Sequence, residues 1–241
     1  MYDFFFDSAD IDFIKSIWSK INHVTSPQHV RGITTNPKAM YRIDCHTLTE
    51  WKNKAHELCA LISEIREDNK GVVYVQLPNC NATPQEALSF AKEISTWGDG
   101  QTKIAMKIPP YKPILEIVDK LEEFVDTNVT GVADSGTALF AASYGVKYVS
   151  IIPGRMEEAG IDSDAHIKQI TDSNLKRTEI IAGSMRSING LKRSVALGTI
   201  PTIGGTVFQL IIKDLSAMEL DNVKCSDKKP ITNQKNIVLS S

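Results

Sequence analysis

The sequence has few cysteines, and their spacing matches neither a metal site nor a disulfide framework. The four are Cys45, Cys59, Cys80 and Cys225, and no two of them form a CxxC pair. A zinc site is therefore not indicated, and neither is a scaffold held together by disulfides. Scattered thiols of this kind favour a reducing compartment.

The sequence also lacks an excess of charge of either sign and any long hydrophobic run. Its 27 basic and 29 acidic residues leave a net charge of −2, which indicates no surface for nucleic acid or for an anionic membrane. No apolar run approaches the roughly 18 residues of a membrane-spanning helix. The first ten residues, MYDFFFDSAD, are too acidic for a secretory signal. We therefore expect a soluble, cytoplasmic protein with no nucleic-acid or membrane partner.

What the sequence does contain is a regular alternation of short apolar runs and helical patterns. Its 42% hydrophobic content is enough for a sizeable core. Runs of strand length separated by helical spacing indicate parallel strands joined by helices. The predicted strands are Tyr2–Phe6, Arg31–Thr34, Val72–Leu77, Ile104–Ile108, Thr127–Thr130, Tyr148–Ile152, Glu179–Ala182 and Thr199–Thr202.

Eight such units in a chain of this length favour an α/β fold with a single closed (β/α)8 barrel, or TIM barrel. An open, doubly wound sheet is the alternative, but no G-x-G-x-x-G segment follows the first predicted strand. We assign residues 1–215 to the barrel and residues 216–241 to a C-terminal tail or arm. The tail includes Asp227–Lys235, a polar segment with little periodicity.

Polar side chains close most of the predicted strands. Because the active site of a (β/α)8 barrel lies at the carboxyl ends of its strands, we expect these side chains to meet at one mouth. Side chains alternate along a strand, so Asn128 and Thr130 share a face, as do Ser150 and Ile152. The polar strand ends are Asp7, Asn36, Gln76, Lys107, Asn128 with Thr130, Ser150 and Ser184.

Lys107 lies between apolar residues in the segment AMKIPP, at the end of a predicted strand. Burial there would lower the pKa of its ammonium group, because a low-dielectric environment disfavours charge. A neutral amine can attack a carbonyl and form a Schiff base. The alternative from this segment alone is a lysine that extends from the strand end into solvent. Lys103 lies lower on the same face, and we expect it to be structural.

Four other side chains at the predicted mouth each have two interpretations. Asp7 is either a general acid or base near the lysine or a cap of the helix that follows. Gln76 cannot titrate, so it either orients a water or is a buried, hydrogen-bonded amide. Arg155 and Arg186 follow successive strands and form either a phosphate site or surface ion pairs.

Taken together, these segments resemble the transaldolase family, in particular its short-chain branch with fructose-6-phosphate aldolase. The resemblance runs from Asp7 to Arg186 in the family's order, and its most specific segments are TTNP and the lysine of MKIP. It implies a barrel of the class I (Schiff-base) aldolase type that needs no metal or other cofactor, acts on a sugar phosphate and forms a homo-oligomer. The matching segments are FFFDSADIDFIK, GITTNPKAM, MKIPP, NVTGVADSGTALFAASYGVKYVS, PGR and AGSMRS.

The resemblance implies a role for each matching position. Lys107 would form the Schiff base, and Asp7 would take the hydroxyl proton as the carbon–carbon bond breaks. Gln76 and Thr130 would hold the catalytic water. The donor-binding positions would be Asn36, Asn128, Ser150 and Ile152, and the phosphate-binding positions would be Arg155, Ser184 and Arg186.

Three positions depart from the family pattern. Gln76 matches fructose-6-phosphate aldolases, whereas transaldolases usually have Glu there. Asn128 is transaldolase-like, and Ile152 matches neither the Phe of transaldolases nor the Tyr of the aldolases. The family's C-terminal helix is also poorly represented after Leu215. This departure argues against the ring-shaped oligomer that is usual in the family.

The leading hypothesis is a transaldolase-type enzyme that moves a dihydroxyacetone unit from a ketose phosphate, such as fructose 6-phosphate, to an aldose phosphate. Fructose-6-phosphate aldolase is the close alternative. A non-catalytic sugar-phosphate-binding barrel and a divergent barrel enzyme acting on another small carbonyl compound are the alternatives from other classes.

Overall fold

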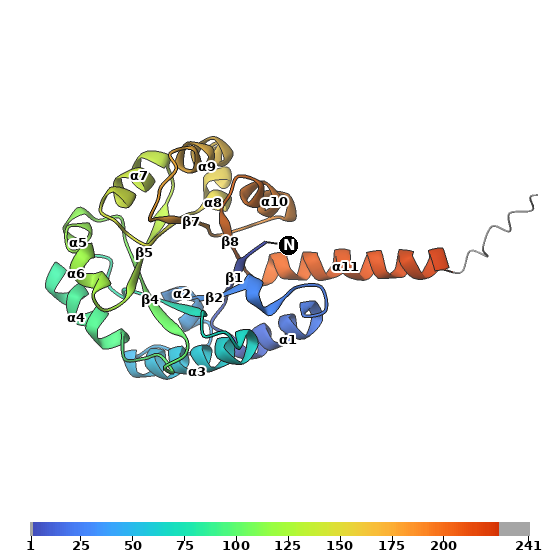
Figure 1. Ribbon diagram of the computed structural model, residues 1–241, viewed down its shortest axis with the longest axis horizontal. Coiled ribbons are helices and arrows are strands. Elements are labelled where there is room, and N and C mark those ends of the chain that lie inside the picture. The colour runs from blue at the N-terminus through green and yellow to red at the C-terminus, as the bar shows by residue number, and fades with distance from the viewer. Residues whose placement is uncertain (1, 227–241) are drawn as a thin grey trace, which may run out of the picture.

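The computed structural model describes residues 2–226 of the 241-residue chain, with side chains up to Leu215. Its parallel strands close into a barrel in sequence order from β1 to β8, and helices surround it (Figure 1). The prediction of a (β/α)8 barrel is therefore confirmed. The strands are β1 Phe4–Asp7, β2 Val30–Thr34, β3 Val72–Gln76, β4 Lys103–Ile108, β5 Asp126–Val132, β6 Tyr148–Ile151, β7 Glu179–Ala182 and β8 Ile200–Ile203.

The helices α1, α2, α3, α4, α7, α9 and α10 each begin after a residue whose side chain caps a free N–H group. Thr47 and Glu50 form a capping box at the start of α3, and Thr83 and Glu86 form another at α4. The helices are α1 Ile11–Ile21, α2 Pro37–Tyr41, α3 Leu48–Arg66, α4 Pro84–Ile94, α5 Lys112–Leu115, α6 Val118–Glu122, α7 Ser135–Ser143, α8 Pro153–Glu158, α9 Ser163–Asp172, α10 Ile188–Ala196 and α11 Gly205–Ser226, with a 3-10 turn at Pro27–His29. Over residues 2–226, no helix is long and apolar enough to cross a membrane.

The core has two parts because strand side chains alternate between the barrel interior and the surrounding helices. The outer part lies between the strands and the helices and includes Ile33, Met106 and Val149. The inner part fills the barrel itself, and we call it the inner layer. Its buried members are Phe5, Val72, Tyr74, Ala105, Tyr148 and Ile181. The interior is therefore packed rather than open, and it forms a floor beneath the mouth of the barrel.

The short helices α2 and α8 were not predicted from the sequence. Both begin at a proline shortly after the end of a strand, at Pro37 after β2 and at Pro153 after β6. Proline favours the first turn of a helix because its fixed backbone angle suits that position and its missing N–H is not needed there. Each helix is only five or six residues long, too short to give a recognisable period of apolar residues.

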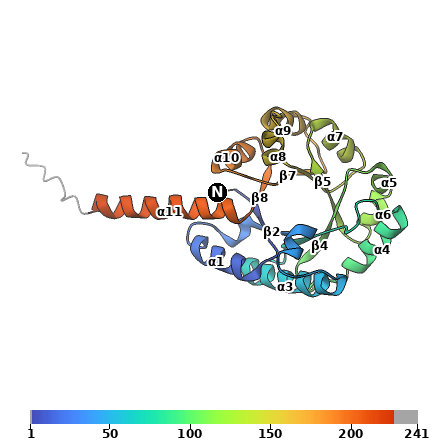
Figure 2. The same cartoon turned by 180° about the vertical axis from the view of Figure 1, so that it is seen from behind.

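Helix α11 also differs from the sequence prediction. It continues past the predicted boundary at residue 215 as far as Ser226, so the expectation of little helix after Leu215 was wrong for this stretch. Ala217, Met218 and Leu220 are strong helix formers, which accounts for the continuation. The helix contacts α1 and α10 and then extends away from the barrel (Figures 1 and 2). The polar segment Asp227–Lys235 lies outside the described residues.

Candidate active site

The predicted strand-end side chains lie one step above the inner layer, toward the carboxyl ends of the strands. Alternation brings this about, since residues two apart on a strand point to the same side. The pairs are Phe5 with Asp7, Tyr74 with Gln76, Ala105 with Lys107, and Tyr148 with Ser150. The register between adjacent strands then places these residues side by side along the barrel wall. The paired residues are Asp7 with Thr34, Gln76 with Lys107, Lys107 with Asn128, and Thr130 with Ser150.

Lys107 is buried at the end of β4, with only 8% of its surface exposed. It therefore does not extend into solvent, which was the alternative interpretation from its sequence segment. Its Nζ donates a hydrogen bond of 3.0 Å to the carbonyl oxygen of Thr35. Burial lowers the pKa of the Lys107 ammonium, and the negative charge of Asp7 partly opposes that shift. Lys103 begins the same strand at the other end of the barrel and is exposed, as expected of a structural residue.

Asp7 closes β1 and is half-buried. The hydroxyl of Thr34 donates a hydrogen bond of 3.1 Å to its Oδ1, which fixes the orientation of the carboxyl group. The cap of α1 is a different residue, because the Oδ1 of Asp10 accepts from the backbone N–H of Phe13 at 3.0 Å. The capping interpretation of Asp7 was therefore wrong, and its carboxyl group is left at the mouth of the barrel.

A cavity of about 240 Å³ reaches Asp7 from the side of α2 and the start of α11. Its wall combines the catalytic candidate Asp7 with the cation of Arg42 and the apolar side chains of Phe13 and Ile43. Asp7 is the only one of the predicted site residues that lines this cavity.

Asn128 and Ser150 form a buried polar pair on β5 and β6. The hydroxyl of Ser150 donates to Oδ1 of Asn128 at 2.9 Å, which leaves the amide nitrogen of Asn128 to act as a donor. That buried nitrogen has no hydrogen-bond partner in the part of the chain that the structure describes. A buried hydrogen-bond donor without a partner lowers the stability of the folded protein. A ligand oxygen that accepts from this nitrogen would remove that free-energy cost.

Asn36 lies at the start of α2, where its Oδ1 accepts from the backbone N–H of Ala39 at 2.9 Å. This contact makes Asn36 the cap of α2 and fixes its amide group at the mouth. Gln76, Thr130 and Ile152 are half-buried at the ends of their strand regions. Ile152 occupies the turn from β6 into α8, where its N–H donates to the carbonyl oxygen of Val132 at 3.0 Å.

Helix α8, which carries Arg155, is in direct contact with the loop after β7, which carries Arg186. Gly154 of α8 lies so close to this loop that a Cβ on it would be 2.0 Å from the carbonyl oxygen of Ser184 and 2.9 Å from Cγ of Arg186. Ser184 itself has a left-handed backbone with φ of 59°, which is uncommon for a residue with a side chain. Such strain is found at ligand sites, where the surroundings hold it.

The two arginines differ in their contacts. Arg155 is exposed and forms no ion pair with any residue that the structure describes. The Nε of Arg186 donates to Oε1 of Glu158 at 2.7 Å, with both side chains about half exposed. The surface ion pair considered from the sequence is therefore present for Arg186, and the phosphate role of both arginines stays a prediction.

Sequence reasoning missed three contacts in this region. These are the carbonyl oxygen of Thr35 that accepts from Lys107, the hydroxyl of Thr34 that holds Asp7, and the pairing of Glu158 with Arg186. Thr34 is the last residue of a predicted strand and begins the TTNP segment, so its position could have indicated the second contact. The backbone carbonyl of Thr35 and the side-chain pair between α8 and the loop after β7 leave no comparable pattern in the sequence.

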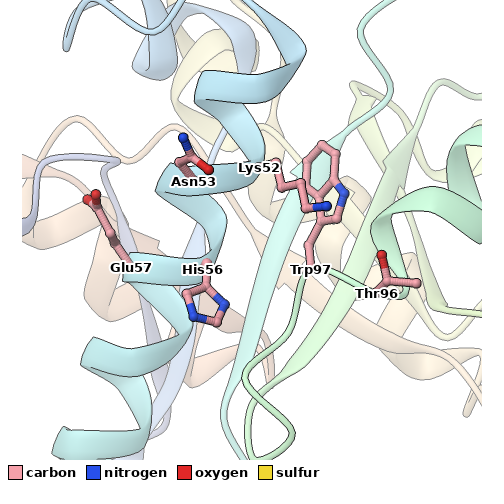
Figure 3. A pocket seen from close by; sticks show the side chains of 6 residues that line it. All are labelled: Lys52, Asn53, His56, Glu57, Thr96 and Trp97. Atoms are coloured by element: carbon pink, nitrogen blue, oxygen red, sulfur yellow. The ribbon is translucent and has the colours of Figure 1, made fainter.

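A second cavity, of about 290 Å³, lies outside the barrel mouth (Figure 3). Side chains from one face of α3, including His56, line one of its sides, and Trp97 lines the other. None of the predicted site residues lines it. The candidate site is therefore the barrel mouth around Lys107 and Asp7.

The site described so far is the mouth of a closed (β/α)8 barrel with a buried lysine at the end of β4. A family model described as transaldolase/fructose-6-phosphate aldolase matches residues 4–238 of the sequence. The chain belongs to this family.

Similar curated proteins carry the same family name. A probable transaldolase of Lactiplantibacillus plantarum is 30% identical over 210 residues, covering 85% of this chain and 86% of the relative. A probable transaldolase of Dehalococcoides mccartyi is 31% identical over 186 residues, covering 76% of each chain. Among solved structures, thiamine phosphate pyrophosphorylase from Pyrococcus furiosus aligns with a TM-score of 0.52 at 11% identity, covering 86% of this chain and 87% of that chain. This last similarity concerns the fold alone.

Proposed function

We propose that the protein is a transaldolase-type enzyme that uses Lys107 to form a Schiff base with a ketose phosphate such as fructose 6-phosphate. The observation that carries this proposal is the burial of Lys107, which lowers its pKa, beside the carboxyl group of Asp7. A lower pKa increases the fraction of neutral amine, and only the neutral amine attacks a carbonyl. The pair therefore combines a nucleophile with an acid or base.

In the proposed reaction, the nitrogen of Lys107 adds to the keto carbon to give a carbinolamine. Loss of water then leaves a protonated Schiff base, with Gln76 and Thr130 holding the water that transfers protons. Asp7 takes the proton of the hydroxyl group beside the bond that breaks, and the electron pair of that bond moves toward the iminium nitrogen. Glyceraldehyde 3-phosphate leaves, and a dihydroxyacetone unit stays on Lys107 as an enamine.

The remaining side chains have binding roles in this proposal. Asn36, Asn128, Ser150 and Ile152 would contact the dihydroxyacetone part of the substrate. The buried amide nitrogen of Asn128 supports this because it has no partner within residues 2–226. At the other end of the substrate, the phosphate would be bound by Arg155, Ser184 and Arg186.

Fructose-6-phosphate aldolase is the close alternative, in which water rather than a second aldose removes the dihydroxyacetone unit. Gln76 favours it, whereas Asn128 and Ile152 favour transfer. The distinguishing experiment is product analysis with fructose 6-phosphate, in the presence and absence of erythrose 4-phosphate. We expect sedoheptulose 7-phosphate to exceed free dihydroxyacetone when the acceptor is present. Mainly free dihydroxyacetone under the same conditions would favour the aldolase.

A non-catalytic sugar-phosphate-binding barrel is the alternative from another class. Such a protein would need Arg155 and Arg186, but it would have no use for a buried lysine beside Asp7. It would bind fructose 6-phosphate and form neither product. We further propose a cytoplasmic location, in line with the thiols of Cys45, Cys59 and Cys80, which are all free.

A further inference from the structure

The Arg186 head group is paired with Glu158 on α8, the helix that also carries Arg155. The side chain of Arg186 passes close to Gly154, because a Cβ on that glycine would be 2.9 Å from the Arg186 Cγ. Its Nε donates to Oε1 of Glu158, the last residue of α8, at 2.7 Å. Arg155 and Glu158 are three residues apart on this helix, so their side chains lie on the same face. The carboxylate that binds Arg186 is therefore next to the position predicted for the substrate phosphate.

Glu158 and its neighbour Glu157 have separate partners, although they are adjacent on the same helix. Glu157 accepts from Arg193 at 2.6 Å and from the hydroxyl of Ser163 at 3.2 Å. Glu158 is paired with Arg186. The two carboxylates have the same charge and lie on the same short helix, but only Glu158 is bound to an arginine that is predicted to bind phosphate. Glu157 is therefore a matched control for Glu158.

We propose that Glu158 is a specificity-determining residue that competes with the substrate phosphate for Arg186. In the free protein, Glu158 holds Arg186 in the ion pair. A phosphorylated substrate displaces the carboxylate from Arg186, which then binds the phosphate together with Arg155. This inference rests on the proposed function, because it assigns the phosphate end of that same site.

Two physical arguments support displacement over a fixed arrangement. The pair is exposed, with 49% of the Arg186 side chain and 59% of the Glu158 side chain accessible, and exposed ion pairs are weak. A phosphate carries more charge than one carboxylate and can accept two parallel hydrogen bonds from the guanidinium. If the carboxylate stayed in place, its negative charge would repel the phosphate. Glu158 therefore lowers the affinity for phosphate while leaving the unphosphorylated part of the substrate unaffected.

The test compares Glu158→Gln with Glu157→Gln at low ionic strength in a buffer without phosphate. Glutamine keeps an oxygen acceptor for the arginine but removes the charge. We expect Glu158→Gln to lower the KM for fructose 6-phosphate by about two- to fivefold, the size of an exposed ion pair. It should also tighten the binding of inorganic phosphate, measured by calorimetry, by the same factor. The kcat and the KM for unphosphorylated fructose should not change, and Glu157→Gln should leave both affinities as in the wild type.

Three results would overturn the proposal. An equal effect of Glu157→Gln would mean that the overall charge, rather than the specific pair, sets the affinity. Unchanged phosphate affinity in Glu158→Gln would mean that Arg186 does not have to leave the carboxylate. Weaker phosphate binding in Glu158→Ala would mean that Glu158 positions Arg186 for the phosphate. If no variant turns over fructose 6-phosphate, the proposed function fails, and the titration with inorganic phosphate still decides the role of Glu158.

Discussion

Replacing Gly154 with alanine tests whether α8, which carries Arg155, and the loop that carries Arg186 must stay in close contact. The added methyl group would be 2.0 Å from the carbonyl oxygen of Ser184, whereas carbon and oxygen atoms normally stay about 3.3 Å or more apart. The helix and the loop must therefore separate by more than 1 Å, roughly the difference between these two distances. Overpacking of this kind costs about 1–3 kcal/mol.

For a chain of this size, each kcal/mol shifts the Tm by roughly 2–4 °C, so Gly154→Ala should lower the Tm by about 2–12 °C. Displacement of the arginines should also reduce kcat/KM for fructose 6-phosphate by about ten- to a hundredfold, since a shift near 1 Å can have an effect of this size. Differential scanning calorimetry and steady-state kinetics measure the two effects. Activity on unphosphorylated fructose should fall much less.

Gly183→Ala is the matched control, because a Cβ there would meet its nearest atoms at 3.6 and 3.7 Å, an ordinary contact distance. The control should show a Tm close to that of the wild type. A Gly154→Ala protein with unchanged Tm and unchanged kinetics would refute the close contact between α8 and the loop after β7. Equal losses on phosphorylated and unphosphorylated substrates would refute the assignment of these two segments to the phosphate.

Three further predictions concern other side chains of the site. Because burial lowers the pKa of Lys107 in the folded protein, the unfolded chain binds more protons above the folded-state pKa, and wild-type stability rises with pH in that range. Lys107→Met should therefore have a larger free energy of unfolding than the wild type at pH 7, and this difference should shrink as the pH rises toward the ordinary lysine pKa. Denaturant titrations at pH 7 and near the ordinary lysine pKa measure the difference, and a value that stays constant between them would contradict the prediction. Arg155→Ala and Arg186→Ala should each raise the KM for phosphorylated substrates by roughly ten- to a hundredfold, as expected for a charge-assisted hydrogen bond, and an equal loss on unphosphorylated fructose would make these arginines structural. Ile152→Tyr should increase the release of free dihydroxyacetone relative to transfer, because it adds a hydroxyl group near the proposed water, whereas Gln76→Glu should favour transfer; product ratios in the opposite order would contradict both.

The alternation of short apolar runs with helical patterns was enough to predict the barrel and its mouth. Lys107 and Asn128 could be placed at the mouth because each is a polar residue near the end of a predicted strand, and β-strand alternation fixes the direction of its side chain. The same rule explains the shared layer of Gln76 and Ser150. These positions depend on local periodicity, which a single sequence contains.

Other features depend on how distant segments meet, and the sequence contains no periodic trace of them. Thr35 contributes a backbone carbonyl to Lys107, 72 residues later in the chain, and any residue type could supply that atom. The pairing of Glu158 with Arg186 depends on how α8 packs at Gly154 against the loop after β7. Asp10 rather than Asp7 caps α1 because the helix begins at Ile11, four residues after the end of the strand at Asp7.

The central claim is that Lys107 forms the covalent bond with the substrate. The most direct measurement is reduction with borohydride in the presence of fructose 6-phosphate or dihydroxyacetone, followed by mass spectrometry of the peptides. We predict an adduct on Lys107 that is absent from the Lys107→Met protein, which should remain folded. An adduct on Lys103, or no adduct on the wild-type protein, would contradict the mechanism.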